Sequence, residues 1–117
     1  MAMTTIYGIK NCDTMKKAFG WLEQNNVPYD FHDYKKQGVP KEIIQQALSE
    51  HGWQNVINKR GTTWRNLPED VKSEITQESA LGLAENNPSI VKRPLLIHKG
   101  QSYLGFKPDI YESIFNG

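Results

Sequence analysis

A strand, a helix and a second strand follow one another within the first 34 residues, and this order constrains the fold more than any other feature. Residues 4–9 are rich in β-branched and aromatic side chains, which predicts a buried strand. Residues 27–34 alternate well enough to predict a second strand. The intervening segment carries one apolar stripe at helical spacing, made of Met15, Ala18, Phe19 and Leu22. A strand–helix–strand unit of about 30 residues predicts parallel strands and therefore an α/β fold.

The middle of the chain, from about residue 38 to residue 86, has a mostly helical pattern. Pro40 predicts the start of a helix, and Gly52 predicts its end. Two further helical pieces are expected to begin at Pro68 and Thr76. We therefore expect a helical insertion within an α/β core.

Strand signals return after this insertion. Residues 95–98 and 102–104 favour strands, and Lys99-Gly100 between them predicts the tight turn of a β-hairpin. Pro108 then predicts the start of a last helix. The apolar face of this last helix is predicted to contain Ile110 and Ile114.

The length and composition are typical of one globular domain. The chain has 117 residues, and its net charge of +1 creates no strong field that would attract nucleic acid or an anionic membrane. No apolar run approaches the ~20 residues of a membrane-spanning helix, and the N-terminus has no secretory stretch. We expect residues 1–117 to form a single domain with the insertion at about 38–86. Since no sustained helical interface is evident, we also expect a monomer. The balanced charge and the short apolar runs lead us to expect that it binds neither nucleic acid nor membrane.

Cys12, the single cysteine, lies between the first strand and the first helix. It cannot form an internal disulfide, and a free thiol survives best in a reducing compartment, which favours the cytoplasm. Unpaired cysteines are most often small buried apolar residues. Here the neighbours Asn11, Asp13 and Thr14 are polar, and the start of a helix offers unpaired N–H groups that stabilise a thiolate. We therefore favour a reactive thiolate over a structural cysteine.

The chain contains no second thiol that could resolve an intermediate on Cys12. A dithiol redox motif commonly has its second cysteine three residues after the first, where this chain has Met15. An external thiol would have to release the intermediate, and glutathione is the obvious co-substrate. No bound cofactor is expected. The three histidines, His32, His51 and His98, lie too far apart in the sequence to predict a metal site.

Two basic stretches are candidates for binding an anion. Residues 58–65 include Arg60, and Lys92 precedes Arg93 and Pro94. Such charges usually lie on solvated surface, but a guanidinium group also offers a planar donor fork that matches carboxylates and oxyanions. Arg93 is the stronger candidate, because it precedes a strand expected beside the first one. The tryptophans lie in different predicted elements and are expected to serve packing: Trp21, Trp53 and Trp64.

Several motifs together resemble the ArsC/Spx family, and most of all its small YffB-like branch. In chain order they are Gly8–Thr14, Phe31–Tyr34, Lys59–Thr62, Arg93-Pro94 and Leu104–Phe106. The resemblance covers nearly the whole chain and preserves the order of the motifs. It implies a thioredoxin-like fold with a helical insertion, in agreement with the split α/β core.

The resemblance also implies roles for individual residues. Cys12 would be the nucleophilic thiol, Arg93 would bind an anionic substrate, and Arg60 would be a second anion-binding arginine. Pro94 would face the cysteine loop with a cis peptide bond. Arsenate reductases of this family have a further arginine near the last helix, where this chain has Lys107, which keeps the charge but lacks the bidentate fork.

These observations lead to one hypothesis and one alternative. The hypothesis is a glutathione-dependent thiol reductase in which Cys12 forms a mixed disulfide that external glutathione resolves. Glutathione, or a small oxidised or oxyanion substrate, would be held by Arg93, Arg60 and Lys107. The hydrogen bonding of the sulfur would be shaped by Asn11 and Thr14. Glutaredoxin is a further candidate partner. The alternative is a non-enzymatic protein-binding module like the Spx-type regulators, which contact RNA polymerase and carry a second cysteine at the place of Met15.

Overall fold

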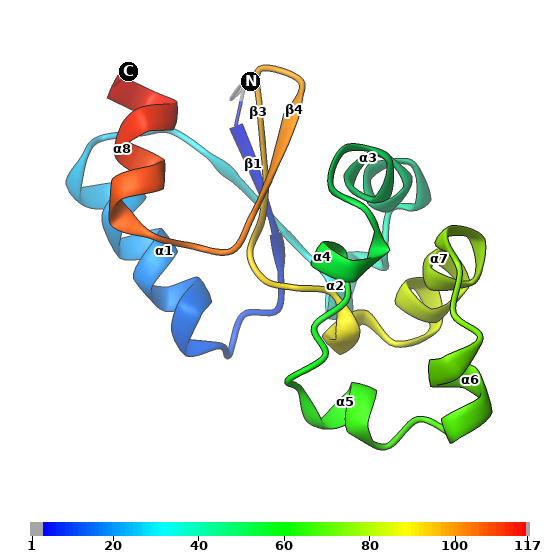
Figure 1. The fold of residues 1–117 in the computed structure, drawn as a ribbon. Helices are drawn as coiled ribbons and strands as arrows, with labels where there is room; N and C mark the ends of the chain where they lie inside the picture. Colours follow the sequence, from blue (N-terminus) through cyan, green and yellow to red (C-terminus); the bar gives the residue numbers. More distant parts are fainter. Residues whose placement is uncertain (1–3, 117) are drawn as a thin grey trace. The chain divides into compact units, whose positions relative to one another are not determined.

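The computed structural model describes residues 4–116. They form two compact units. The end unit combines the two ends of the chain, up to Tyr34 and from Arg93, and the middle unit comprises Lys35–Lys92. Figure 1 draws the end unit in blue to cyan and orange to red, and the middle unit mostly in green to yellow. The predicted insertion at about 38–86 lies inside the middle unit, while the single-domain organisation stays a prediction.

The end unit is built on a four-stranded sheet with the strand order β2-β1-β3-β4. Its strands are β1 (Thr4–Gly8), β2 (Asp30–Asp33), β3 (Leu95–His98) and β4 (Gln101–Leu104). The predicted parallel pair is confirmed between β1 and β2, and β3 lies antiparallel to both β1 and β4. β2 is shorter than the predicted strand over 27–34: Val27 and Tyr29 lie in the connection before it and pack against the core, and Tyr34 begins α2.

The hairpin between β3 and β4 is confirmed, with its turn at Lys99 and Gly100. Both residues have positive φ, 51° at Lys99 and 80° at Gly100. Two successive positive φ values give a turn whose twist matches that of the flanking strands. Glycine adopts this conformation without steric cost, which explains its place in the turn.

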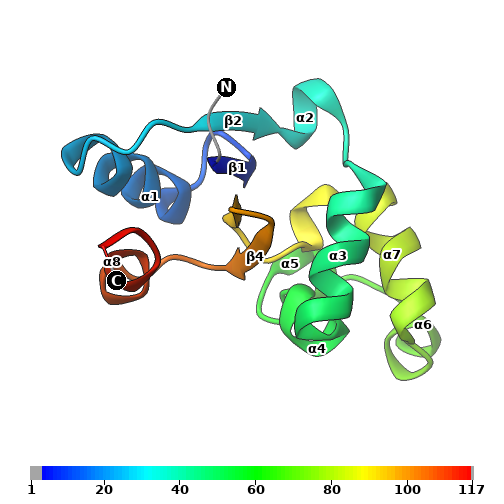
Figure 2. The same cartoon turned by 90° about the horizontal axis from the view of Figure 1, so that it is seen from above.

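Two helices, α1 (Asp13–Gln24) and α8 (Pro108–Asn116), cover one face of this sheet (Figures 1 and 2). Side chains of both helices and of the central strands form one buried cluster, which comprises Ile6, Met15, Ala18, Leu22, Leu96 and Tyr111. Removal of this apolar surface from water is the main term that holds the helices to the sheet. The stripe predicted for the first helix is therefore confirmed, with Phe19 packed at the margin of the cluster.

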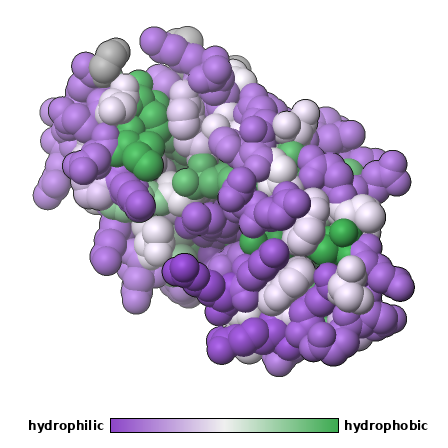
Figure 3. All heavy atoms as spheres, in the orientation of Figure 1, coloured by the Kyte–Doolittle hydropathy of each residue, from purple (hydrophilic) through white to green (hydrophobic). Residues whose placement is uncertain are grey.

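The face that α8 buries agrees with the predicted one at Ile114, which packs against the core, and differs from it at Ile110. Tyr111 is fully buried and packs edge-on against Trp21 and Phe106, whereas Ile110 is 46% exposed. The buried face is centred on Tyr111 because Ile114 and Phe115, three and four residues later, also pack against the core. Ile110 lines a surface hollow together with residues of β4 and α8, namely Tyr103, Asp109, Ser113 and Ile114. Figure 3 shows an apolar patch, green at the upper left, in the region that α8 occupies.

The middle unit consists of short helices. They are α3 (Lys41–His51), α4 (Trp53–Val56), α5 (Thr62–Arg65), α6 (Glu69–Ser73), α7 (Gln77–Asn86) and the 3-10 helix η1 (Pro88–Ile90), preceded by α2 (Tyr34–Gln37). α3, α6 and α7 begin directly after Pro40, Pro68 and Thr76, as predicted, and α3 ends before Gly52. The sequence did not predict α2, α4 and α5, because four residues are too few to show a helical period.

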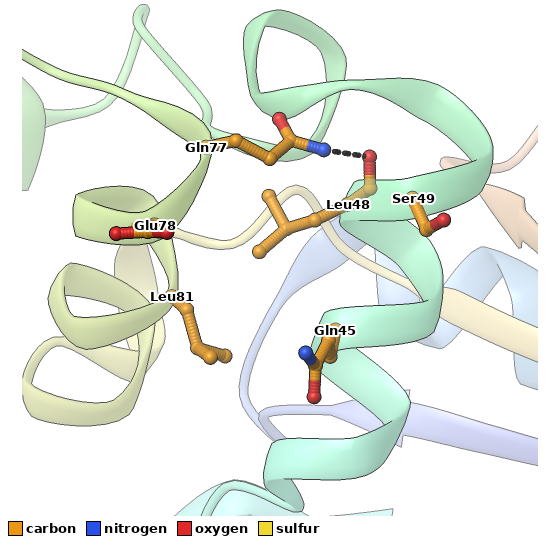
Figure 4. A pocket seen from close by; sticks show the side chains of 6 residues that line it. All are labelled: Gln45, Leu48, Ser49, Gln77, Glu78 and Leu81. Carbon is orange, nitrogen blue, oxygen red and sulfur yellow. Dashed lines mark hydrogen bonds between the residues drawn. The ribbon is translucent and has the colours of Figure 1, made fainter.

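Gln77 ties three elements of the middle unit together. Its side-chain Nε2 donates a hydrogen bond to the carbonyl of Leu48 in α3, the dashed line in Figure 4. Its Oε1 accepts a hydrogen bond of 3.0 Å from the N–H of Trp53, the first residue of α4. Thr76 and Ser79 close a capping box at the start of α7, which holds Gln77 in place. The end of α3 and the starts of α4 and α7 are thus joined at one side chain.

Candidate functional site

Cys12 is the residue directly before α1 and has an extended backbone, with φ −136° and ψ 130°. Its carbonyl accepts a helical hydrogen bond from the N–H of Lys16, at 3.0 Å. Its thiol is free and partly buried. The first N–H groups of a helix have no helical partner, so they point toward this position. The predicted placement of the thiol at the amino end of a helix is confirmed.

The surroundings of Cys12 favour its thiolate form. Burial raises the pKa of the thiol, but hydrogen bonds from the N–H of Met15, from the Arg93 side chain and from the N–H of Thr14 lower it. The positive charge of Arg93 lowers it further, and the resulting pKa lies below the ordinary value of a thiol. Because the thiolate is the nucleophilic form, this arrangement supplies a reactive sulfur closer to neutral pH.

The register of the sheet brings Arg93 to Cys12. β3 pairs with β1, with Leu95 opposite the penultimate residue of β1, and Arg93 lies two residues before Leu95. The peptide bond between Arg93 and Pro94 is cis, as predicted, and Pro94 is fully buried. The carbonyl of Pro94 accepts a hydrogen bond of 2.9 Å from the N–H of Gly105. The segment that carries Arg93 is therefore fixed to the residue that follows β4, at the end of the hairpin.

Gly8 and Met15 bring β1 and α1 close together behind Cys12. A Cβ atom at Gly8 would lie 2.6 Å from Sδ and 2.8 Å from Cε of Met15. Met15 is fully buried. The residue at the place of a second cysteine therefore serves packing, and only glycine at position 8 admits it this closely.

The other predicted residues of the end unit contribute in different ways. Thr14 donates its backbone N–H to the Cys12 sulfur. Asn11 and Lys107 are exposed, and no described contact joins either side chain to the thiol. The carbonyl of Lys107 accepts hydrogen bonds from the N–H groups of Ile110 and Tyr111, so its backbone starts α8 while its side chain faces solvent.

Arg60 lies in the middle unit, in the loop between α4 and α5. Its backbone N–H donates a hydrogen bond of 3.1 Å to Oδ1 of Asn58, and its side chain is exposed. Beside it, the Lys59 ammonium lies over the rings of Trp53 and Trp64, which stack on each other. Sequence reasoning placed these tryptophans in separate packing positions, because no periodicity links residues eleven apart in different short helices.

Tyr34 is a further residue that sequence reasoning missed. It directly follows β2, at the edge of the sheet where Asp33 pairs with Gly8. Its side chain is buried, and its hydroxyl has no hydrogen-bond partner among the described residues. Burial raises the pKa of Tyr34 and nearby Tyr7 raises it further, while the charge of Arg93 acts in the opposite direction. A neutral phenol therefore lies within the electrostatic reach of Arg93.

The structure also bears on metal binding and on membrane insertion. Within residues 4–116, no group of three or more His, Cys, Asp or Glu side chains is arranged to hold a metal ion. No helix of that same range is long and apolar enough to cross a membrane.

Residues 7–114 match the model of the ArsC family, and the chain therefore belongs to the ArsC family. A protein of Haemophilus influenzae is 42% identical over 113 residues, which cover 97% of this chain and 99% of that protein. The global transcriptional regulator Spx of Streptococcus agalactiae is 30% identical over 109 residues, which cover 92% of this chain and 79% of the regulator. The predicted ArsC/Spx resemblance is confirmed.

Solved structures give the same result for the fold. A YffB protein has a TM-score of 0.91 and 47% identity, with 94% of this chain and 96% of that chain covered, in agreement with the YffB-like branch. An arsenate reductase related protein from Brucella melitensis has a TM-score of 0.77 and 50% identity, with 100% and 97% covered. A glutaredoxin from Archaeoglobus fulgidus shares the fold alone, at TM-score 0.54 and 14% identity, with 100% and 89% covered. The predicted thioredoxin-like α/β fold is confirmed.

Proposed function

We propose that this protein is a glutathione-dependent thiol reductase with Cys12 as its nucleophile. The observation that carries the proposal is the environment of the sulfur, where the N–H groups of Thr14 and Met15 and the side chain of Arg93 all stabilise a thiolate. Membership of the ArsC family and the similarity to an arsenate reductase related protein support thiol chemistry at this position.

The proposed reaction has two thiol–disulfide exchange steps. The Cys12 thiolate attacks the glutathione sulfur of a substrate–glutathione mixed disulfide, the S–S bond breaks, and the substrate leaves as a thiolate that takes up a proton. Cys12 then carries glutathione in a mixed disulfide. A second glutathione thiolate attacks the glutathione sulfur of that disulfide, which releases oxidised glutathione and regenerates the Cys12 thiolate. In the net reaction the mixed disulfide and one glutathione thiol become the free substrate thiol and one glutathione disulfide, so one S–S bond breaks for each one that forms.

Cationic side chains would hold the anionic groups of the reactants. Arg93 would bind a glutathione carboxylate or a substrate oxyanion through its planar fork, with Arg60 and Lys107 as further charges. Asn11 and Thr14 would shape the hydrogen bonding of the sulfur. Because lysine at position 107 offers a point charge in place of a fork, we expect mixed disulfides to be better substrates than arsenate.

The proposal also covers the cellular compartment and the partners of the reaction. A free thiolate and reduced glutathione both belong to a reducing compartment, so we place the reaction in the cytoplasm. The protein would act as a monomer on glutathione and a small oxidised or oxyanion substrate, with glutaredoxin as a further thiol donor. Nucleic acid, membranes and bound cofactors have no part in it.

The Cys12→Ser variant tests this function in a thiol-transfer assay with a glutathionylated peptide and reduced glutathione. We expect the rate to fall to that of the uncatalysed reaction, and mass spectrometry to find one glutathione adduct on the unmodified protein and none on the variant. Lys17→Met, a change on the exposed surface of α1, is the control and should keep full activity. Full activity of Cys12→Ser would contradict the proposal.

A second candidate is a non-enzymatic protein-binding module, which the similarity to the Spx regulator supports. Such a module needs no activated thiol. The pH dependence of alkylation of Cys12 by iodoacetamide should then give the pKa of an ordinary thiol, about 8.5. An ordinary profile together with no thiol transfer would favour the module. A profile shifted to lower pH would favour the reductase.

A further inference from the structure

Tyr34 lies at the same edge of the sheet as Arg93 and the loop of Cys12, within the end unit. β1 runs toward Cys12, β2 is parallel to it and β3 is antiparallel to it. Because β1 is the strand between them, the end of β2 and the start of β3 lie on either side of the end of β1. Tyr34 directly follows β2, and Arg93 lies two residues before β3. One tyrosine and one arginine therefore flank the strand that leads to the thiol.

A row of aromatic side chains holds the ring of Tyr34. Successive side chains of a strand point to opposite faces of a sheet. Ile6 belongs to the buried cluster that contains side chains of α1 and α8, so the next residue, Tyr7, points to the other face. The ring centroid of Tyr7 lies 5.1 Å from that of His32, and the centroid of His32 lies 6.1 Å from that of Tyr34. Side chains of β1 and β2 thus place the phenol ring of Tyr34.

The hydroxyl group of Tyr34 is not explained by packing. Tyr34 is 2% exposed, and its hydroxyl has no hydrogen-bond partner within residues 4–116. A buried hydroxyl without a hydrogen bond destabilises a fold, so phenylalanine would serve packing better at this position. Burial and nearby Tyr7 raise the pKa of Tyr34, while the charge of Arg93 acts in the opposite direction. The hydroxyl is therefore neutral and lies in the electric field of Arg93.

Tyr111 of α8 provides a matched comparison within the same unit. It is also fully buried, and its hydroxyl likewise has no hydrogen-bond partner among the described residues. Burial raises the pKa of Tyr111, without a contribution from an arginine. An explanation of the Tyr34 hydroxyl by burial alone would apply equally to Tyr111. The feature that distinguishes Tyr34 is its proximity to Arg93.

We propose that Tyr34 is a positioning residue whose hydroxyl oxygen attracts the guanidinium group of Arg93 and keeps it directed at the sulfur of Cys12. A hydroxyl hydrogen rotates freely, so the negative end of the O–H dipole can turn toward a cation. Inside a protein such a dipole acts on a charge more strongly than it does in water. Arg93 in turn donates a hydrogen bond to the sulfur of Cys12. The inference rests on the proposed function, because the position of Arg93 matters for activity only if Cys12 works as a thiolate.

The pH dependence of alkylation of Cys12 by iodoacetamide tests the role of the hydroxyl. Tyr34→Phe removes one oxygen atom and keeps the ring. We expect the pKa of Cys12 to rise and alkylation at pH 7 to slow about twofold to threefold, because Arg93 keeps its charge but is held less closely to the sulfur. Tyr111→Phe is the matched control and should leave the profile unchanged. An unchanged profile in Tyr34→Phe, or equal shifts in both variants, would overturn the inference.

Urea unfolding separates this effect from a loss of fold. Both variants remove a buried hydroxyl without a described partner, so the midpoint of unfolding should stay the same or rise in both. A shifted alkylation profile with an undiminished midpoint in Tyr34→Phe would support the positioning role. A lower midpoint with an unchanged profile would assign the hydroxyl to the fold and overturn the inference.

A double variant tests whether Tyr34 acts through Arg93. If it does, Tyr34→Phe should have no further effect on alkylation in an Arg93→Ala background. The same slowing in both backgrounds would mean that the hydroxyl acts on the sulfur without Arg93, and would overturn the inference. Thiol transfer to the glutathionylated peptide is measured on the same proteins. A profile shift that depends on Arg93, in a protein without thiol transfer, would support the positioning role and locate the failure in the proposed function.

Discussion

The Cys12 loop and the Arg60 loop each carry one candidate site residue near the start of a helix, but the two loops are held by different means. Cys12 directly precedes the 12-residue helix α1, whose first N–H groups reach the sulfur. Arg60 lies one residue before the cap of the four-residue helix α5. Buried packing of Met15 supports the first loop, whereas exposed and partly exposed side chains support the second.

The chemistry of the two groups explains this difference. A thiolate is stable near neutral pH only if fixed donors surround it, so its loop has to be part of the core. An arginine is charged at every working pH without any such donors. Surface contacts of modest strength are enough to hold its loop. The two loops should therefore respond very differently to small changes.

The largest difference is expected from adding one methyl group to each loop. Gly8→Ala would place Cβ 2.6 Å from Sδ of fully buried Met15, so we expect a loss of about 1–3 kcal/mol in the free energy of unfolding. Gly61→Ala would place Cβ 3.3 Å from Nδ2 of Asn58, a partly buried loop residue, at an ordinary φ of −82°. Its effect should stay within about 0.5 kcal/mol.

Urea unfolding of both variants measures these values. Gly20→Ala is the control in α1, where a Cβ atom would meet nothing within 4 Å, and it should stabilise the protein by about 0.5–1 kcal/mol. Equal losses for Gly8→Ala and Gly61→Ala would mean that both loops depend equally on close packing, and the contrast between them would be lost.

The region around Cys12 was largely predictable from the sequence, because each step rests on a local pattern. The apolar spacing from Met15 to Leu22 placed the thiol before a helix. The Lys99-Gly100 turn fixed the hairpin, and pairing of its first strand with β1 followed from the fold. Arg93 could therefore be expected near the thiol without any coordinates.

The region around Arg60 was not predictable in the same way. Trp53 and Trp64 belong to two four-residue helices, α4 and α5, and stack on each other in the fold, but neither helix is long enough to leave a period in the sequence. The buried position of Tyr34 was not predicted, because its burial depends on tertiary packing and not on its immediate neighbours in the sequence. The choice of Tyr111 over Ile110 as the buried face of α8 likewise depends on the aromatic partners that surround it.

The second prediction concerns the charge beside the thiolate. Arg93→Ala removes a hydrogen bond and a positive charge that lower the pKa of Cys12, so the pKa should rise and alkylation by iodoacetamide at pH 7 should slow about fivefold, the ratio that ~1 kcal/mol gives. The groups that lower this pKa all belong to the end unit, so Arg60→Ala should leave the alkylation profile unchanged. A matching shift in Arg60→Ala would show that the two loops share one electrostatic role.

The third prediction addresses the support of Arg60. Asn58→Ala removes the side-chain acceptor of the Arg60 N–H at an exposed site, so we expect a loss of about 0.5–1 kcal/mol in the free energy of unfolding, measured in urea. Asn58→Asp keeps an oxygen acceptor at the same position and should lose less. A larger loss in Asn58→Asp than in Asn58→Ala would argue against this hydrogen bond as the support of the loop.

The smallest effect is the pH dependence that the thiolate gives to stability. The folded state lowers the pKa of Cys12, so between that pKa and the unfolded value of about 8.5 the unfolded chain binds more protons than the native one. Stability should therefore rise with pH across this window, level off above about 8.5, and fall as pH drops through the folded pKa. The difference in the free energy of unfolding in urea between the unmodified protein and Cys12→Ser, measured from about pH 6 to 9, isolates this contribution.

Arg60→Ala is the control. The difference in the free energy of unfolding between the unmodified protein and Arg60→Ala should not change with pH, because arginine does not titrate in this range. A flat difference for Cys12→Ser as well would mean that the fold does not stabilise the thiolate, and the distinction between a core-supported anion and a surface-held cation would no longer stand.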